Sequence, residues 1–108
     1  MATPKPGKNV RGSSSGRPIM ALLDLLGRRW ALRILWELRD KPLTFRALRD
    51  AMDGVSPTVL NARLAELREV DIVVGTSSGY VLTEHGHELF RALTPLYSFA
   101  ESWGQHLE

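Results

Sequence analysis

The stretch VSPTVLNARLAEL, from Val55 to Leu67, has the pattern of a helix with a well-defined start. Ser56 is a good N-cap, because its hydroxyl can accept a hydrogen bond from a free backbone N–H of the first turn. Pro57 suits the first helical position, where its missing N–H is not needed. Leucines at helical spacing form one apolar stripe, which consists of Leu60, Leu64 and Leu67. The opposite face carries small, uncharged side chains that allow close approach to another molecule: Thr58, Asn61, Ala62 and Ala65.

The preceding stretch, KPLTFRALRDAMDG, predicts a second short helix. Thr44 caps this helix, and its buried stripe consists of Phe45, Leu48 and Met52. Asp53 and Gly54 then form a tight turn into the helix that Ser56 starts. Two short capped helices joined by a turn that contains glycine are typical of a helix-turn-helix.

The segment DIVVGTSSGYVLT, residues 71–83, predicts a β-hairpin. β-Branched residues at 72–74 precede the turn residues 76–79, and the apolar residues 80–82 follow them. A hairpin directly after the second helix of a helix-turn-helix is the wing of a winged helix. The predicted fold is therefore mainly α with a small β-hairpin, a winged helix-turn-helix.

The stretch RRWALRILWELRD predicts a further helix, with Trp30 on its buried face. Two more helices are predicted, one before this stretch and one after the hairpin. The first covers Ile19 to Leu26 and ends at Gly27. The last starts at the cap Thr83, and we expect Pro95 to interrupt and kink it. Both carry more apolar residues than a lone surface helix needs, which predicts a homodimer that forms through them. The expected interface residues are Leu22, Leu26, Leu93, Leu96, Tyr97 and Trp103.

Composition and charge divide the chain into a tail and a domain. Residues 1–18 are rich in Pro, Gly and Ser, which predicts a disordered tail, and residues 19–108 form the winged-helix domain. The tail is basic and contains no acid. Residues 28–63 have eight basic and four acidic side chains, whereas residues 64–108 have two basic and seven acidic ones. This split indicates that the basic end faces a polyanion, with ordinary solvated helix faces as the alternative.

The same composition excludes several function classes. The 108 residues suit one small domain, and the absence of cysteine excludes disulfides and thiol chemistry. No apolar run approaches the roughly 20 residues of a membrane span, so we expect a cytoplasmic protein. His85 and His87 point about 200° apart on a helix, which argues against a shared metal ion. No nucleophile–base pair or phosphate-binding loop is present, so we expect neither an enzyme nor a cofactor.

These motifs in this order resemble the HxlR-type winged helix-turn-helix transcriptional regulators, which are relatives of the MarR group. The matching segments are GRRW, LRILWEL, TFRALRDAMDGVSPTVLNARLAEL, YVLTEHGHEL and the final WG at residues 103–104. The resemblance implies a DNA-binding dimer formed through the first and last helices, with the helix 56–69 as the recognition helix. The chain departs from the family in lacking an N-terminal cysteine and in having a short wing tip, TSSG, without Arg or Lys.

The outer face of the helix 56–69 is the predicted base-reading surface. A recognition helix enters the major groove of double-stranded DNA with its N-terminal residues against base edges. Ser56 and Thr58 can contact phosphates or base edges, and Asn61 can bridge N6 and N7 of adenine. Ala62 keeps the face narrow enough for close approach. The alternative for Asn61 is an exposed polar residue without a partner.

Three arginines are predicted to contact phosphates. Such contacts position the protein on DNA without reading its sequence. Arg63 flanks the apolar stripe of the recognition helix, and Arg46 and Arg49 lie on the helix before it. For Arg63 an ion pair with Glu66 or Glu37 is an equal alternative. We also expect the basic tail to lie along phosphates, with an idle tail as its alternative.

A C2 dimer would present two recognition helices to an inverted repeat in double-stranded DNA. Two other functions remain open from the sequence. One is a winged-helix protein-interaction module without specific DNA binding, which the bare wing permits. The other is a regulator that responds to an unknown small molecule in a pocket at the dimer interface. Trp30, Trp36 and Trp103 are candidates to line that pocket, with plain core packing as their alternative.

Overall fold

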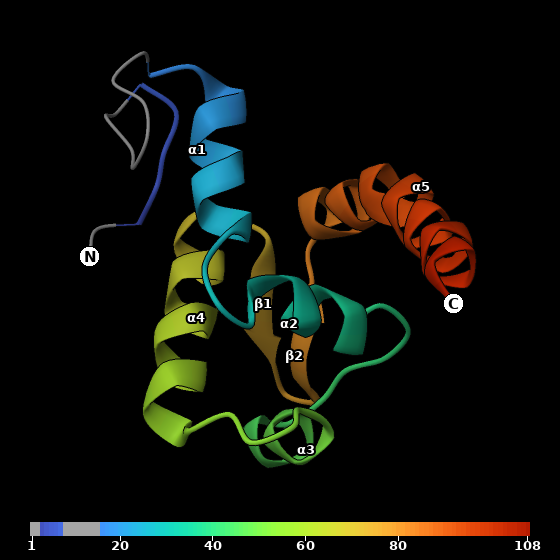
Figure 1. Cartoon of the computed structure of the whole chain (residues 1–108). Coiled ribbons are helices and arrows are strands. Elements are labelled where there is room, and N and C mark those ends of the chain that lie inside the picture. The colour runs from blue at the N-terminus through green and yellow to red at the C-terminus, as the bar shows by residue number, and fades with distance from the viewer. Residues whose placement is uncertain (1–2, 8–15) are drawn as a thin grey trace.

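The computed structural model describes residues 3–7 and 16–108, which form five helices and one antiparallel pair of strands (Figure 1). The predicted fold class is confirmed. Helix α1 spans Pro18–Leu26, and α2 spans Ala31–Glu37. The other predicted tail residues, 1–2 and 8–15, lie outside the described part of the chain.

Helices α3, Phe45–Ala51, and α4, Pro57–Glu69, form the predicted helix-turn-helix. Both begin at the predicted caps. The Thr44 hydroxyl accepts a hydrogen bond from the N–H of Ala47, and the Ser56 hydroxyl accepts one from the N–H of Val59, each at 3.1 Å. The caps satisfy N–H groups that a helix leaves free in its first turn.

The wing consists of strands β1, Val73–Thr76, and β2, Gly79–Leu82, which pair antiparallel with Thr76 opposite Gly79. The hairpin is therefore confirmed, but its turn is shorter than expected, with two residues at 77–78. A further pair of backbone hydrogen bonds joins Tyr80 to Leu43, with N···O distances of 2.7 and 3.1 Å. These bonds attach the wing to the loop between α2 and α3.

The junction between α1 and α2 differs from the prediction. Gly27 ends α1 as expected, but Trp30 precedes α2 instead of lying within it. The backbone of Trp30 is left-handed, with a φ of 79°, a conformation that is costly for a bulky residue. The indole packs against the core, and the Arg29 guanidinium lies 5.2 Å from the centre of its rings. Packing therefore fixes a backbone conformation that the helical pattern did not predict.

Helix α5, Glu84–Leu107, begins at the predicted cap, since the Thr83 hydroxyl accepts a hydrogen bond from the N–H of Gly86 at 2.9 Å. The expected interruption at Pro95 is wrong, because α5 continues through this residue to Leu107. Within residues 3–7 and 16–108, no helix is both long enough and apolar enough to cross a membrane.

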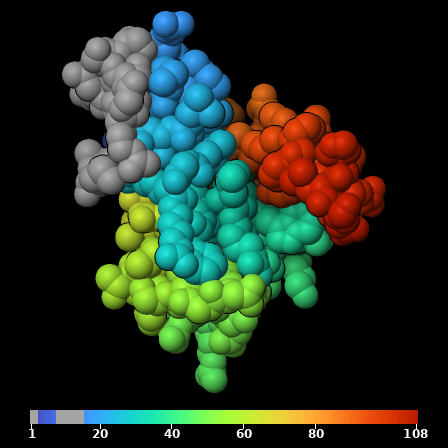
Figure 2. Space-filling model, viewed as in Figure 1, coloured from blue at the N-terminus to red at the C-terminus, as the bar shows by residue number. Residues whose placement is uncertain are grey.

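The core lies among α2, α3, α4 and the wing. The predicted leucine stripe of α4 is confirmed, since its three side chains are at most 2% exposed. The first half of α5 packs against this core through Leu89, Phe90 and Leu93. The second half of α5 stands out from one side of the molecule (Figure 2). The helix-turn-helix thus packs on a well-buried core, whereas the end of α5 has little contact with that core.

Candidate nucleic-acid interface

The outer face of α4 is exposed and carries no charge along its first two turns. Its members are small or uncharged, and they are Ser56, Pro57, Thr58, Asn61, Ala62 and Ala65. The N-terminal end of α4 lies beside α3 at the end of the molecule away from α1 (Figure 1). The outward orientation expected from helical periodicity is therefore correct.

The polar groups on this face differ in what they can offer a ligand. The Ser56 oxygen already accepts a hydrogen bond from Val59, so its hydroxyl proton remains for donation. Within the described residues, the side chains of Thr58 and Asn61 have no hydrogen-bond partner. The Asn61 amide therefore retains its donors and its acceptor, and a bidentate contact to adenine uses one of each.

Basic side chains surround this face on α3 and at the end of α4. Arg46 and Arg49 are exposed, lie one turn apart, and have no partner in the described part of the chain. Arg68, which was not among the predicted contact residues, is also exposed. It lies seven residues after Asn61, on the same side of α4, and this helical spacing was the available signal.

Arg63 points back into the protein. Its Nε donates to the backbone oxygen of Arg29 at 2.9 Å, and its terminal nitrogen lies 3.0 Å from both carboxylate oxygens of Glu66. Glu37, the other partner considered, pairs with Arg33 at 2.7 Å. The sequence left two roles open for Arg63, a phosphate contact and an ion pair. The structure contains the ion pair, with Glu66 as the partner.

This ion pair belongs to a nearly buried network between α1 and α4. The Arg28 guanidinium lies 2.7 Å from the Glu66 carboxylate and 3.7 Å from the Asp24 carboxylate. The side chains of Arg28 and Asp24 are each 5% exposed, and that of Glu66 is 13% exposed. Glu66 thus joins two arginines from different parts of the chain and holds the C-terminal part of α4 against the end of α1.

The wing tip is compact and uncharged. The Thr76 hydroxyl donates to the backbone oxygen of Gly79 at 2.8 Å and accepts from the N–H of Ser78 at 3.2 Å. A side chain at residue 79, where φ is 124°, would collide with the backbone of Leu43. The tip can therefore offer hydroxyl and backbone groups to a phosphate, but no cation.

At the base of the wing, His85 Nδ1 lies 2.7 Å from the carboxylate of Asp71. The hydrogen bond to Asp71 and its charge raise the pKa of His85 above the ordinary value. Among residues 3–7 and 16–108, no group of three or more His, Asp or Glu side chains is arranged to hold a metal ion. The contact of His85 is thus an exposed pair that links the start of α5 to the end of α4.

The sequence profile described as HxlR-like helix-turn-helix matches residues 25–108. The chain belongs to the HxlR-like helix-turn-helix family. Its curated relatives carry the name HTH-type transcriptional regulator, so this family is one of transcriptional regulators and not of enzymes.

One relative of this HxlR-like protein is MJ0925 of Methanocaldococcus jannaschii, an HTH-type transcriptional regulator. It is 26% identical over 88 residues, which are 78% of this chain and 83% of the relative. Quinone-bound YodB from B. subtilis matches with a TM-score of 0.68 at 30% identity, over 82% of this chain and 96% of YodB. A MarR family regulator from Enterococcus faecalis V583 matches with a TM-score of 0.73 at 26% identity, over 91% of this chain and 96% of that one.

The HxlR-like chain exposes large apolar side chains on its first and last helices. Of the six residues predicted at a dimer interface, Leu96 and Trp103 are each 54% exposed. Leu22, Leu26 and Tyr97 are half-buried, and Leu93 packs against the core. Other strongly exposed apolar residues were not predicted, and they are Ile19, Leu23, Phe99 and Leu107. On α5, residues 96, 99, 103 and 107 follow helical spacing, which was the signal for the two that were missed.

The three tryptophans of the HxlR-like chain do not gather around one cavity within the described residues. Trp36 packs against Tyr97, with 5.0 Å between ring centres, and the Arg39 guanidinium lies 3.8 Å from the Trp36 rings. Trp103 stacks on Phe99 at 6.3 Å. In the described part of the chain, Trp36 and Trp103 therefore make packing and surface contacts.

Proposed function

We propose that this regulator binds double-stranded DNA sequence-specifically as a homodimer, with α4 in the major groove. The observation that carries the proposal is the outer face of α4. This face is exposed and narrow, and it has an unpaired amide at Asn61. Small side chains at Ala62 and Ala65 allow the close approach that a hydrogen bond from Asn61 to an adenine edge needs.

Basic residues around α4 would fix the position of the protein on the duplex. Arg46 and Arg49 on α3, together with Arg68 at the end of α4, are exposed and available for phosphates. Ser56 and Thr58 at the start of α4 add hydroxyl donors. Arg63 acts indirectly in this proposal, because its charge is engaged by Glu66.

Dimerisation would occur through α1 and the second half of α5. The exposed apolar stripe at residues 96, 99, 103 and 107 has no covering element within the described chain. Such a stripe is larger than the scattered apolar residues of an ordinary surface. A two-fold axis through this interface would direct two α4 helices to half-sites of an inverted repeat.

The basic tail, residues 1–18, would add sequence-independent contacts to phosphates. Lys5 is paired with Glu69 at 3.0 Å in the structure, and this surface pair can exchange for a phosphate at little cost.

A response to a small molecule is a second part of the proposal. The YodB structure is that of a quinone-bound protein, so a close structural neighbour accommodates such a ligand. This chain contains no cysteine, so an effector would bind without forming a bond to a thiol.

Selection of bound sequences from random duplex DNA tests the main proposal. We expect enrichment of an inverted repeat with half-sites about 10 base pairs apart, or a multiple of this spacing. No enrichment, with binding to all duplexes equally weak, would refute sequence-specific binding and favour a protein-interaction module.

A further inference from the structure

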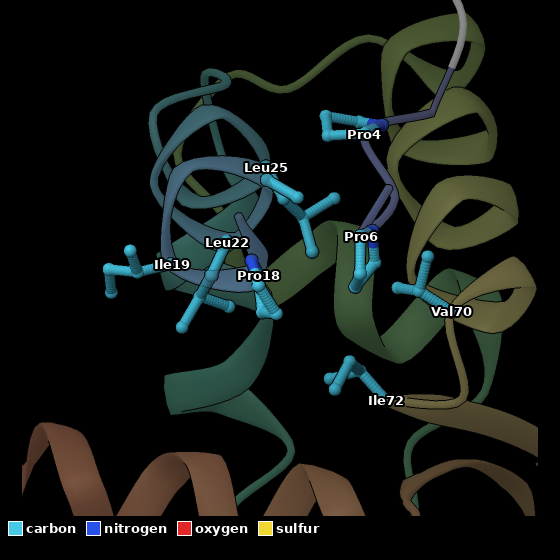
Figure 3. Close-up of a pocket in the computed structure, with 9 residues that line it drawn as sticks. Pro4, Pro6, Pro18, Ile19, Leu22, Leu25, Val70 and Ile72 are labelled. Atoms are coloured by element: carbon cyan, nitrogen blue, oxygen red, sulfur yellow. The ribbon is translucent and has the colours of Figure 1, made fainter. Parts of the chain in front are cut away.

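An apolar cavity of about 420 Å³ lies between α1, the segment 3–7 and the end of α4 (Figure 3). Leu22 and Leu25 reach into it from α1, and Pro4 and Pro6 face them from the segment 3–7. Val70 and Ile72 line a third side. The volume lies within the range of about 300–1,000 Å³ that is typical of ligand sites.

The lining of this cavity contains no charged or hydrogen-bonding side chain. Its nine residues are Pro, Ile, Leu, Val and Ala. An ionised ligand would lose its hydration there without gaining a partner, which is costly. The chemistry of the walls therefore selects an uncharged, largely apolar molecule.

The segment 3–7 forms a wall that polar contacts hold from outside. The Lys5 ammonium pairs with Glu69 on α4, and the N–H of Gly7 donates to the backbone oxygen of Gly16 at 2.7 Å. The Lys5 and Glu69 side chains are 43% and 47% exposed, so water competes for this pair. The Lys5–Glu69 pair therefore holds this wall only weakly.

The cavity also borders the helices that are proposed to bind DNA and to form the dimer. Val70 is the C-cap of α4, so a ligand in the cavity contacts the end of the recognition helix. The backbone oxygen of Ile72 accepts the N–H of Thr83 at 3.0 Å, immediately before α5. Leu22 belongs to α1 and also lines a neighbouring groove that reaches Glu88 and Leu89 of α5.

The geometry points to a binding site for a small, uncharged, apolar molecule whose occupancy changes DNA affinity through the end of α4. The ligand is held without a covalent bond, since the chain has no cysteine. The effect on DNA affinity rests on the proposed DNA binding, whereas the binding site itself does not.

Fluorescence titration of the full chain with N-phenyl-1-naphthylamine, an uncharged aromatic probe that brightens in apolar surroundings, tests the site. We expect saturable binding. Ala21→Leu fills the cavity from the buried side of α1 and should weaken binding about tenfold. Pro6→Glu places a charge at the cavity wall and should weaken it similarly, whereas the matched control Pro6→Leu should bind nearly as the wild type does.

Pro6 is exposed, so its two variants remain informative even if Ala21→Leu does not fold. Probe binding that Pro6→Glu leaves unchanged would overturn the site, because the probe would then occupy another surface, such as the stripe on α5. With duplex DNA from the selection, saturating probe should change affinity at least about fivefold. Probe bound in the cavity with unchanged DNA affinity would overturn the coupling. A protein that binds the probe but no duplex would refute the DNA-binding proposal and leave the site standing.

Discussion

Replacing Glu66 by glutamine removes the carboxylate that Arg28 and Arg63 share, while it preserves the length and shape of the side chain. Removing one partner of a buried ion pair costs about 3–5 kcal/mol, because the remaining charge stays buried without compensation. The cost here should be lower, since Arg28 keeps Asp24 at 3.7 Å and the glutamine oxygen can still accept a hydrogen bond. We therefore expect a loss of about 2 kcal/mol in the free energy of unfolding.

Urea denaturation at fixed protein concentration measures this loss, and thermal unfolding should show a midpoint lower by roughly 10 °C. Glu69→Gln is the matched control, because it removes the same charge from the same helix. Its partner Lys5 is exposed, and a surface pair of this kind contributes little. Equal midpoints for the two variants would show that the network at Glu66 does not stabilise the packing of α4 against α1.

Asn61→Ala should cost about 1–3 kcal/mol per half-site on the selected sequence and little on unrelated duplexes. Equal losses in titrations of both duplexes would remove Asn61 from base reading. Replacing Arg46 and Arg49 by alanine should weaken binding to every duplex and reduce the slope of log K against log salt by about 0.9 for each phosphate that is no longer neutralised. An unchanged slope would place both arginines away from DNA. Trp103→Glu should yield a monomer in light scattering, because it puts a charge into the apolar stripe; a persisting dimer would exclude the stripe from the interface. Deleting residues 1–18 should flatten the salt slope and weaken specific and nonspecific binding alike, and an unaltered slope would show an idle tail.

Local features of the fold could be predicted from the sequence because they depend on neighbouring residues. The caps at Thr44, Ser56 and Thr83 each bond an N–H three residues ahead, so a short window of sequence contains both partners. The hairpin likewise depends on two β-branched runs around a turn. The outward direction of Asn61 follows from the leucine stripe on the other side of α4.

Features that depend on distant residues could not be predicted. Arg28 is buried because Glu66 lies beside it, and 38 residues separate the two in sequence. The left-handed backbone of Trp30 follows from packing of the indole, which the helical pattern cannot reveal. The ion-pair partner of Arg63 could not be predicted for the same reason, because the sequence alone does not distinguish Glu37 from Glu66. The cavity beside Pro4 combines a tail segment with α1 and α4, which no local motif connects.

Two glycines, Gly79 and Gly86, allow the wing and the start of α5 to lie close against neighbouring backbone. A side chain at Gly79 would collide with the backbone of Leu43, and one at Gly86 would collide with the backbone oxygen of Ile72. The segment 79–86 therefore lies close against backbone at both ends. Because these contacts involve backbone atoms, we expect a tilt of the first turn of α5 to move the hairpin with it. In the proposed dimer, the angle at which the two protomers join would then set the distance between their wings on a duplex.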